Sequence, residues 1–260
     1  MQIFPNLKRA MRYAQDFLRM HGQKIEHSQW QGIEAPAPLF SVDNVYIRAC
    51  MPGTKIALEE QTQPDLPWAD DHFNERIGGK PLNPGEQYLN WPHYKKDVGG
   101  NDKKFRVAGD GKFTHTYMER FWPKYAVNSS FPQTPLKGIR YEYGDLDDVI
   151  KLLIKNPHTR QAVLPIWFPE DTGAKHGGRL PCSICYTFQR RGNDFHLHYL
   201  IRSCDFKRHF HNDVYMAVRL AQYVLTILKE HGNEWKYVEM GILTMDIIDL
   251  HVFYPERNLL

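Results

Sequence analysis

The side chains of this chain that are best suited to chemistry are concentrated between residues 179 and 213. The pair Pro181-Cys182 opens this stretch, and the polar run Arg-Ser-Cys-Asp follows at positions 202–205. A cysteine thiolate is a strong nucleophile at neutral pH, and nearby arginines such as Arg179 and Arg202 lower the pKa of a thiol. A guanidinium fork beside the hydroxyl of Ser203 suits a phosphate. The stretch therefore predicts one active site with a nucleophile and an anion-binding pair.

Each of these residues also has a structural interpretation. Cys182 could be an inert buried cysteine. Its CxxC spacing with Cys185 is found in thiol redox proteins, but that motif begins a helix, and here it opens a strand whose alternation separates the two thiols. Because a second CxxC is missing from the sequence, we expect no zinc site. Asp213 could simply cap a helix, and His251 lies among apolar residues, as core histidines do.

The hydrophobic pattern predicts which elements carry these residues. Helical spacing or capping signals mark three segments, and alternating or β-branched residues mark five. Strands and helices do not alternate regularly, so we expect an α+β fold. The expected helices are 7–20, 145–156 and 213–231, and the expected strands are 40–49, 161–168, 183–189, 194–201 and 238–253. The strand at 161–168 contains Pro165 and is therefore expected at a sheet edge.

Length and composition favour one globular domain that spans residues 1–260. The chain is 42% hydrophobic, and its net charge of +3 argues against a protein that mainly coats nucleic acid. Residues 51–111 are rich in proline and glycine, so we expect loops and short helices that cover a site. No apolar run is long enough to span a membrane, and four scattered cysteines do not make a disulfide framework. A reducing, cytoplasmic setting is the simplest expectation.

Taken together, these motifs resemble the thymidylate synthase superfamily over about residues 113–254. The matching motifs are Pro181-Cys182, the Arg-Ser-x-Asp run at 202–205, and a late His-x-aromatic motif at His251 and Phe253. The segment 156–160, which ends in Arg160, is similar to the phosphate-binding segment that this family contributes across its dimer. The resemblance implies a mixed sheet with a long buried helix, a homodimer that pairs through its sheets, and methylenetetrahydrofolate as co-substrate.

Two departures from the synthases point to a different pyrimidine. Counted without gaps from Arg202, the synthases place asparagine where this chain has Asp213, and they place histidine where it has Ser183. Phage-type deoxycytidylate (dCMP) hydroxymethylases are similar to this chain at both positions. A carboxylate accepts hydrogen bonds from the amino group of cytosine, and from the ring nitrogen when that nitrogen is protonated, whereas it opposes the carbonyl of uracil. The resemblance thus implies a dCMP hydroxymethylase.

The resemblance also implies a role for each site residue. Cys182 adds to carbon 6 of the pyrimidine, carbon 5 takes the one-carbon unit, and water completes a hydroxymethyl group. The implied catalytic residues are Cys182, Tyr117 and a glutamate, with Glu75 as our choice and Glu86 as its rival. The implied ligand contacts are Arg160, Arg202 and Ser203 for phosphate, Asp213 for the base, His251 for the sugar and Asp205 for the pterin.

Further departures keep other functions open. Gln161 replaces a second arginine of the phosphate segment, and Phe253 lacks the hydroxyl of the family's tyrosine. The alternatives are a thymidylate synthase or hydroxymethylase that acts on deoxyuridylate (dUMP), a catalytically inactive nucleotide- or RNA-binding relative, and a thiol redox protein. The sequence also ends soon after His251, which is expected to leave the site open to water. A DNA-modifying phage, and hence host cytoplasm, or a nucleoside-antibiotic pathway would be the setting.

Overall fold

We describe the protein from a computed structural model, in which residues 2–30, 33–92, 113, 115–123, 144–172 and 180–260 are described. Arg179, which was expected near Cys182, lies outside these residues.

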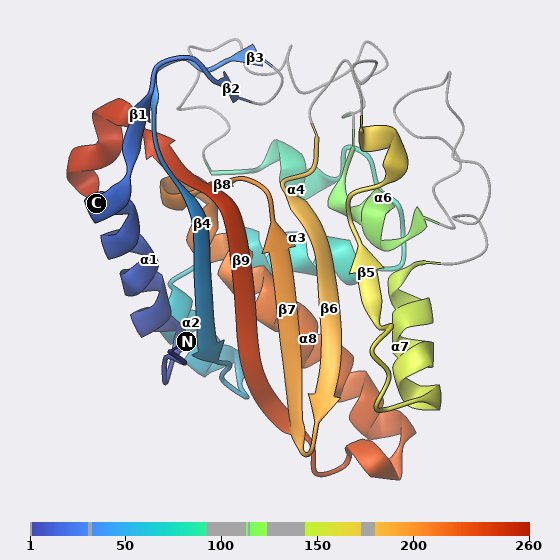
Figure 1. The fold of residues 1–260 in the computed structure, drawn as a ribbon. Coiled ribbons are helices and arrows are strands. Elements are labelled where there is room, and N and C mark those ends of the chain that lie inside the picture. The colour runs from blue at the N-terminus through green and yellow to red at the C-terminus, as the bar shows by residue number, and fades with distance from the viewer. Residues whose placement is uncertain (1, 31–32, 93–112, 114, 124–143, 173–179) are drawn as a thin grey trace.

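A mixed, seven-stranded sheet is the centre of the fold (Figure 1). Strands β7 and β9 are parallel and adjacent, and helix α8 connects them. The short strand β8 also runs parallel to β9, and the other pairs are antiparallel. In spatial order the strands are β1 (Gln23–Ile25), β4 (Leu39–Cys50), β9 (Glu239–Phe253), β7 (Asp194–Ile201), β6 (Ser183–Arg191) and β5 (Val163–Pro165), with β8 (Cys204–Asp205) beside β9; β2 (Gln29–Trp30) and β3 (Ile33–Glu34) form a separate ribbon.

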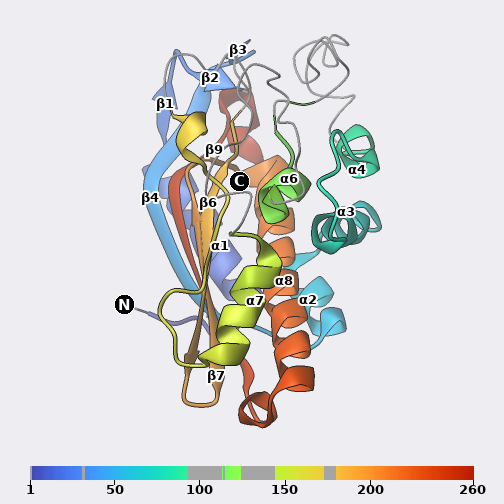
Figure 2. The ribbon, with the colours of Figure 1, turned by 90° about the vertical axis from the view of Figure 1, so that its right-hand side faces the viewer.

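The helices pack against one side of this sheet (Figure 2). The longest is α8 (His211–His231), which buries eleven side chains, from Asn212 to Leu228, between the sheet and its neighbours. No described helix covers the other side of the sheet. The remaining helices are α1 (Leu7–His21), α2 (Lys55–Thr62), α3 (Trp68–Ile77), α4 (Glu86–Leu89), α6 (Tyr117–Phe121) and α7 (Leu146–Lys155), with short 3-10 helices at Pro169–Asp171, Asn233–Trp235 and Tyr254–Leu259.

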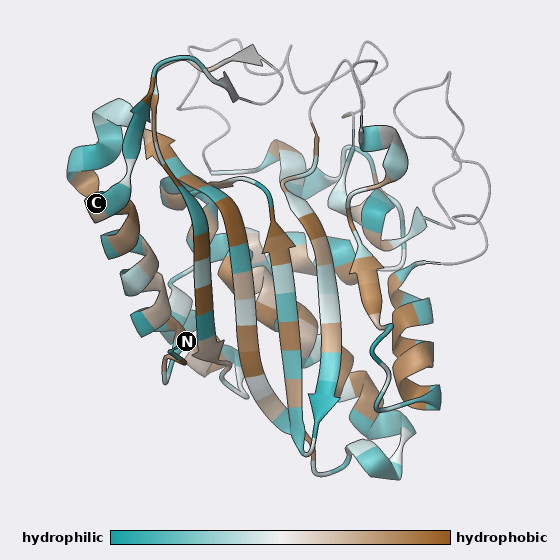
Figure 3. Ribbon diagram, in the orientation of Figure 1, coloured by the Kyte–Doolittle hydropathy of each residue, from teal (hydrophilic) through white to brown (hydrophobic). Residues whose placement is uncertain are grey.

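Period-two alternation gives the sheet one side that faces the helices and one that does not. Hydrophobic and hydrophilic bands alternate along β4, β9, β7 and β6 (Figure 3). Buried residues such as Val45, Ile47, Leu197 and Leu243 lie between more exposed ones. The α+β fold predicted from the sequence is therefore confirmed, with a mixed sheet and a long buried helix.

Most predicted elements occur where the sequence placed them, and two differ. Helix α7 begins with Asp145 in a reciprocal capping box, as its start signals indicated. The strand predicted at 161–168 is reduced to β5, which lies at the sheet edge, where a proline is tolerated. The helix predicted from Asp213 begins at His211 and follows a π-helical turn, Phe206–Phe210.

The capping residue at this helix start is Asp205, not Asp213. The Asp205 carboxylate accepts hydrogen bonds from the backbone N–H groups of Lys207 and Arg208, both at 3.0 Å. These N–H groups are among those that a helix start leaves unsatisfied. The side chain of Asp213 is therefore available for another role.

Candidate active site

A pocket lies where the start of β6, the start of α8 and helix α3 meet. Its lining includes Arg76, Tyr117, Cys182, Ser203 and Asp213. Four of these were predicted as site residues from the sequence. The fold thus brings together a thiol, a phenol, a hydroxyl, a carboxyl and a guanidinium from distant parts of the chain.

Cys182 immediately precedes β6 and is held there by Arg202. The backbone N–H of Arg202 donates to the carbonyl of Cys182 at 2.8 Å. The guanidinium Nε of Arg202 donates to the carbonyl of Pro181 at 2.9 Å, and Nη2 to that of Leu180 at 3.3 Å. Arg202 does not line the pocket, so its observed contacts fix the segment that presents the thiol. A guanidinium has further N–H donors that can reach a ligand.

Tyr117 lies beside this segment and is bonded to the residue after the cysteine. Its hydroxyl is 3.0 Å from the hydroxyl of Ser183, which is in turn 2.6 Å from the hydroxyl of Tyr199. Burial, together with the negative charges of Cys182 and Asp213, raises the pKa of Tyr117. Tyr117 therefore stays a neutral phenol that can donate a hydrogen bond. Ser183 is fully buried, so it supports Tyr117 and does not line the pocket.

Asp213 projects from the first turn of α8 into the pocket. Burial raises the pKa of Asp213 to about 7, although the charge of Arg76 and a hydrogen bond from Cys204 lower it. The thiol of Cys204 lies 3.7 Å from Oδ2 of Asp213. Near neutral pH this carboxyl group therefore populates both its acid and its anionic forms.

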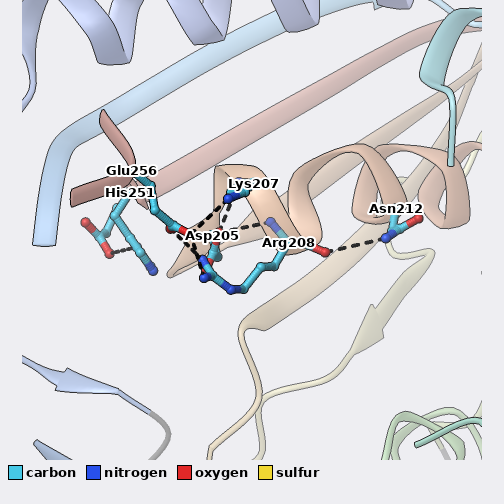
Figure 4. Close-up of polar contacts among 7 residues, drawn as sticks. Asp205, Lys207, Arg208, Asn212, His251 and Glu256 are labelled. Atoms are coloured by element: carbon cyan, nitrogen blue, oxygen red, sulfur yellow. Dashed lines mark hydrogen bonds and ion pairs between the residues drawn. The ribbon is translucent and has the colours of Figure 1, made fainter. Parts of the chain in front are cut away.

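The neighbouring Asn212 has a different environment. It is fully buried, its side-chain carbonyl accepts from the backbone N–H of Asp65, and its amide donates to the Asp65 carboxylate, both at 2.9 Å. Figure 4 shows this amide directed toward the π-helical turn at Arg208. Asn212 is therefore committed to the fold, and Asp213 is the residue of this pair that lines the pocket.

Helix α3 supplies pocket residues that the sequence did not single out. Trp68, His72 and Arg76 recur every fourth residue and all line the pocket. Nε and Nη2 of Arg76 contact Nε2 of His72 at 3.2 and 3.0 Å. Burial and the charge of Arg76 hold the pKa of His72 well below its usual value, so the ring is neutral. The four-residue spacing of these aromatic and basic residues was the sequence signal that could have identified them.

Glu75 lies on the same helix but points elsewhere. Its carboxylate accepts from the backbone N–H groups of Glu86 and Gln87, with the shortest contact at 2.7 Å, and so anchors the start of α4. Oε2 of Glu75 lies 3.6 Å from Nδ1 of His72. Glu75 is not part of the pocket lining and adjoins it through His72, whereas Glu86 is exposed.

A second polar group lies behind Ser203. The hydroxyl of Ser203, which lines the pocket, donates to Oδ2 of Asp249 at 3.3 Å, and Nδ1 of His251 lies 2.8 Å from the same oxygen. Ser41 also donates to the Asp249 carboxylate. Burial disfavours the charged form of His251, but Asp249 outweighs burial and raises the pKa of His251. Asp249, which sequence reasoning missed, therefore connects the predicted residues Ser203 and His251.

Asp205 is engaged within the chain. Besides capping the π-helical turn, it accepts from Arg208 at 3.1 Å, and Arg208 also forms a two-pronged pair with Glu256, with both contacts at 2.8 Å (Figure 4). The guanidinium of Arg208 lies 4.7 Å from the ring centre of Phe253. Asp205 is buried outside the pocket lining, and the ring of Phe253 packs against the guanidinium of Arg208.

Arg160, predicted for phosphate, is exposed at the turn between α7 and β5 and does not line the pocket. The described residues contain no cluster of three or more histidine, cysteine or acidic side chains that could hold a metal ion. Among the described segments, no helix is both long and apolar enough to cross a membrane.

Aromatic rings form the outer walls of the pocket. Trp91 and His209 stack with their ring centres 4.8 Å apart and their planes 6° apart, and Trp68 stacks on His72 at 5.2 Å. Flat aromatic walls suit a flat conjugated ligand.

Comparison with known proteins agrees with the architecture. No protein-family model matches the sequence, and no curated protein matches it. Among solved structures, the thermostable thymidylate synthase A from Bacillus subtilis aligns with a TM-score of 0.62 at 15% sequence identity, over 97% of this chain and 82% of that one. At this identity the likeness concerns the fold. The chain therefore has the thymidylate synthase fold.

Proposed function

We propose that this protein is a folate-dependent enzyme that transfers a one-carbon unit to carbon 5 of deoxycytidylate and yields 5-hydroxymethyl-deoxycytidylate. The observation that carries the proposal is the side-chain arrangement at the start of α8. Asp213 lines the same pocket as the thiol of Cys182, while Asn212 is bonded to Asp65. The residue available to read a pyrimidine edge is therefore a carboxyl group.

The chemistry of that carboxyl group favours cytosine. The protonated acid form donates to the ring nitrogen of neutral cytosine and accepts from its amino group, and a pKa of about 7 keeps this form populated at neutral pH. The anionic form pairs equally well with cytosine protonated at the ring nitrogen. Uracil instead presents a ring N–H and a carbonyl, which the protonated acid could satisfy but the anionic carboxylate cannot, so discrimination against uracil rests on the anionic form.

Cys182 acts as the nucleophile in this proposal. Its thiolate forms a bond to carbon 6, and the electron pair of the ring double bond moves to carbon 5. Methylenetetrahydrofolate supplies the one-carbon unit at the oxidation level of formaldehyde. Carbon 5 loses its proton after the transfer, water supplies the hydroxyl, and the Cys182–carbon bond breaks to restore the ring double bond. The net reaction consumes one water and releases tetrahydrofolate, so no reductant is required.

The other pocket residues hold the reactants and move protons. Tyr117, a neutral phenol beside the nucleophile segment, donates a hydrogen bond toward the reacting base. Glu75 acts on water and protons through His72, which is the side chain that separates it from the pocket. The walls at Trp68 and Trp91 hold the pterin. Asp205 is an indirect support, because its carboxylate is already bonded.

Phosphate and sugar contacts extend from the same centre. The remaining N–H donors of Arg202 bind the phosphate, and the Ser203 hydroxyl adds a donor when its single proton turns from Asp249 to the phosphate. Asp249 orients His251, which binds the sugar hydroxyl. Arg160 is exposed in its own chain. We assign it to the phosphate of a second copy.

This second copy would pack against the uncovered sheet side. Val163 and Ile248 are large apolar side chains there that are 40% and 43% exposed. Val163 lies on the same side of the sheet as Thr187, because the two residues are paired in register between β5 and β6. Ile248 lies on the same side as Thr244, because the two are an even number of residues apart on β9. Exposed apolar residues on a bare sheet favour a homodimer.

The rival function is a nucleotide-binding protein without catalysis. Cys182→Ala removes the thiol and leaves the remaining lining, so an enzyme loses all turnover of deoxycytidylate while calorimetry still detects nucleotide binding. Cys185→Ala is the matched control, because Cys185 is not part of the pocket lining and is expected to be dispensable. Wild-type protein that binds deoxycytidylate but never transforms it in the presence of the folate would support the binding protein instead. A requirement for Cys185 would favour thiol redox chemistry.

A further inference from the structure

Arg76 is a buried arginine with unusual partners. It is 5% exposed and lines the pocket. The two other buried arginines of the described segments each contact carboxylates, since Arg120 pairs with Asp171 at 2.7 and 2.8 Å and Arg208 pairs with Glu256. Among the described residues, no carboxylate lies within ion-pair distance of Arg76. Burying a cation without a paired anion is unfavourable, so its position requires another explanation.

Neutral groups fix the orientation of this guanidinium. His72 accepts from Nε and Nη2, and the ring of Tyr117 lies 4.1 Å from the guanidinium carbon. The backbone carbonyl of Arg76 accepts from the indole of Trp122 at 2.7 Å, which fixes the helix locally. A neutral imidazole and an aromatic face hold the cation without neutralising it. Its positive charge therefore remains available to the pocket.

The acidic groups that act on Arg76 come from four different elements. Burial would lower the pKa of Arg76, but its acidic neighbours outweigh burial and raise it. These neighbours are Tyr88 on α4, Tyr117 on α6, Tyr186 on β6 and Asp213 on α8. Cys182 belongs to the same electrostatic group, because its negative charge acts on Tyr117.

We propose that Arg76 is a positioning residue whose charge keeps Cys182 as a reactive thiolate and stabilises the anionic form of Asp213. A thiolate and a carboxylate in one buried pocket repel each other, and a cation in the same pocket offsets that repulsion. The proposal deepens the function proposed above and rests on it only for the identity of the nucleophile. His72 serves Arg76 by holding the guanidinium without quenching its charge.

Alkylation of Cys182 tests this proposal without any nucleotide or folate. The full-length protein is treated with iodoacetamide at a series of pH values, and modification is followed by fragment-ion mass spectrometry, which also separates Cys182 from Cys185 on the shared tryptic peptide 180–190. Since one pKa unit is a tenfold change in thiolate population, Arg76→Gln is expected to raise the midpoint of the profile and to slow alkylation at neutral pH about tenfold. Arg76→Lys keeps a cation and is expected to retain most of the wild-type rate.

Two further variants make the outcome decisive. Arg219→Met removes a cation that lies 4.8 Å from the ring of Phe73 on α3 and does not line the pocket, so the profile should not change. Arg76→Met is a second neutral variant if Arg76→Gln fails to fold. An unchanged midpoint in a folded neutral variant overturns the proposal, as does an equal shift in Arg76→Lys. A shifted midpoint in a protein that never converts deoxycytidylate supports Arg76 and rejects the proposed function.

Discussion

At the residue scale, the distinction between Asn212 and Asp213 decides the substrate proposal. The sequence predicted Cys182, Tyr117, Ser203 and Asp213 as site residues, and these line one pocket. It did not predict Arg76, because a lysine or arginine in a loop-rich segment is usually a solvated surface residue. The four-residue spacing of Arg76 from His72 and Trp68 was a local signal for one shared helix face, but packing of α3 against α8 decides that this face lines the pocket.

Asp213 gives a prediction for stability. Its folded-state pKa of about 7 lies above the usual value of 3.8, so the folded protein holds a proton that the unfolded chain releases. The contribution of the protonated Asp213 carboxyl group to the free energy of unfolding is fully present below pH 3.8 and is lost as pH rises through about 7. Asp213→Asn cannot ionise, so its stability relative to wild type should increase over that range. Urea denaturation at several pH values measures this difference, and a constant difference across pH would contradict it.

At the element scale, the start of α8 shows what sequence rules could and could not predict. Asp213 had the residue type and position of a helix cap, yet Asp205 caps the preceding π-helical turn. A π-helical turn has no strong sequence signature, and such turns occur often at functional sites. The extra turn moves the cap upstream, which leaves Asp213 to face the pocket.

Arg208 is expected to anchor this element and the C-terminal 3-10 helix. Arg208→Met leaves the carboxylates of Asp205 and Glu256 without this partner, and breaking a buried pair costs about 3–5 kcal/mol. Lys207→Met is the matched control, because Lys207 is an exposed neighbour that also pairs with Glu256, and its loss should cost less than about 1 kcal/mol. Urea denaturation compares the two, and similar losses would contradict the proposed anchoring.

At the scale of the whole molecule, the fold was predictable because its largest elements have clear periodicity. The predicted hairpin corresponds to β6 and β7, and the last predicted strand corresponds to β9. The order of strands in the sheet was not predicted, since pairing between distant strands leaves no local signal. The uncovered side of the sheet follows from that order and from the placement of all described helices on the other side (Figure 2).

We expect this uncovered side to mediate a homodimer. Thr244→Arg introduces a charge among the β9 side chains there and should yield a monomer by light scattering. Glu230→Arg, at an exposed position on α8, is the control that should remain dimeric. If wild type is a monomer at micromolar concentration, or if both variants remain dimeric, the sheet-mediated dimer is contradicted.

The identity of the product formed from labelled deoxycytidylate and methylenetetrahydrofolate tests the central claim most directly. The account predicts 5-hydroxymethyl-deoxycytidylate and tetrahydrofolate, with little conversion of deoxyuridylate. It also predicts that Asp213→Asn shifts the preference toward deoxyuridylate. Conversion of deoxyuridylate but not deoxycytidylate by the wild-type protein would contradict the cytosine assignment, and a methylated product with dihydrofolate would establish a synthase instead.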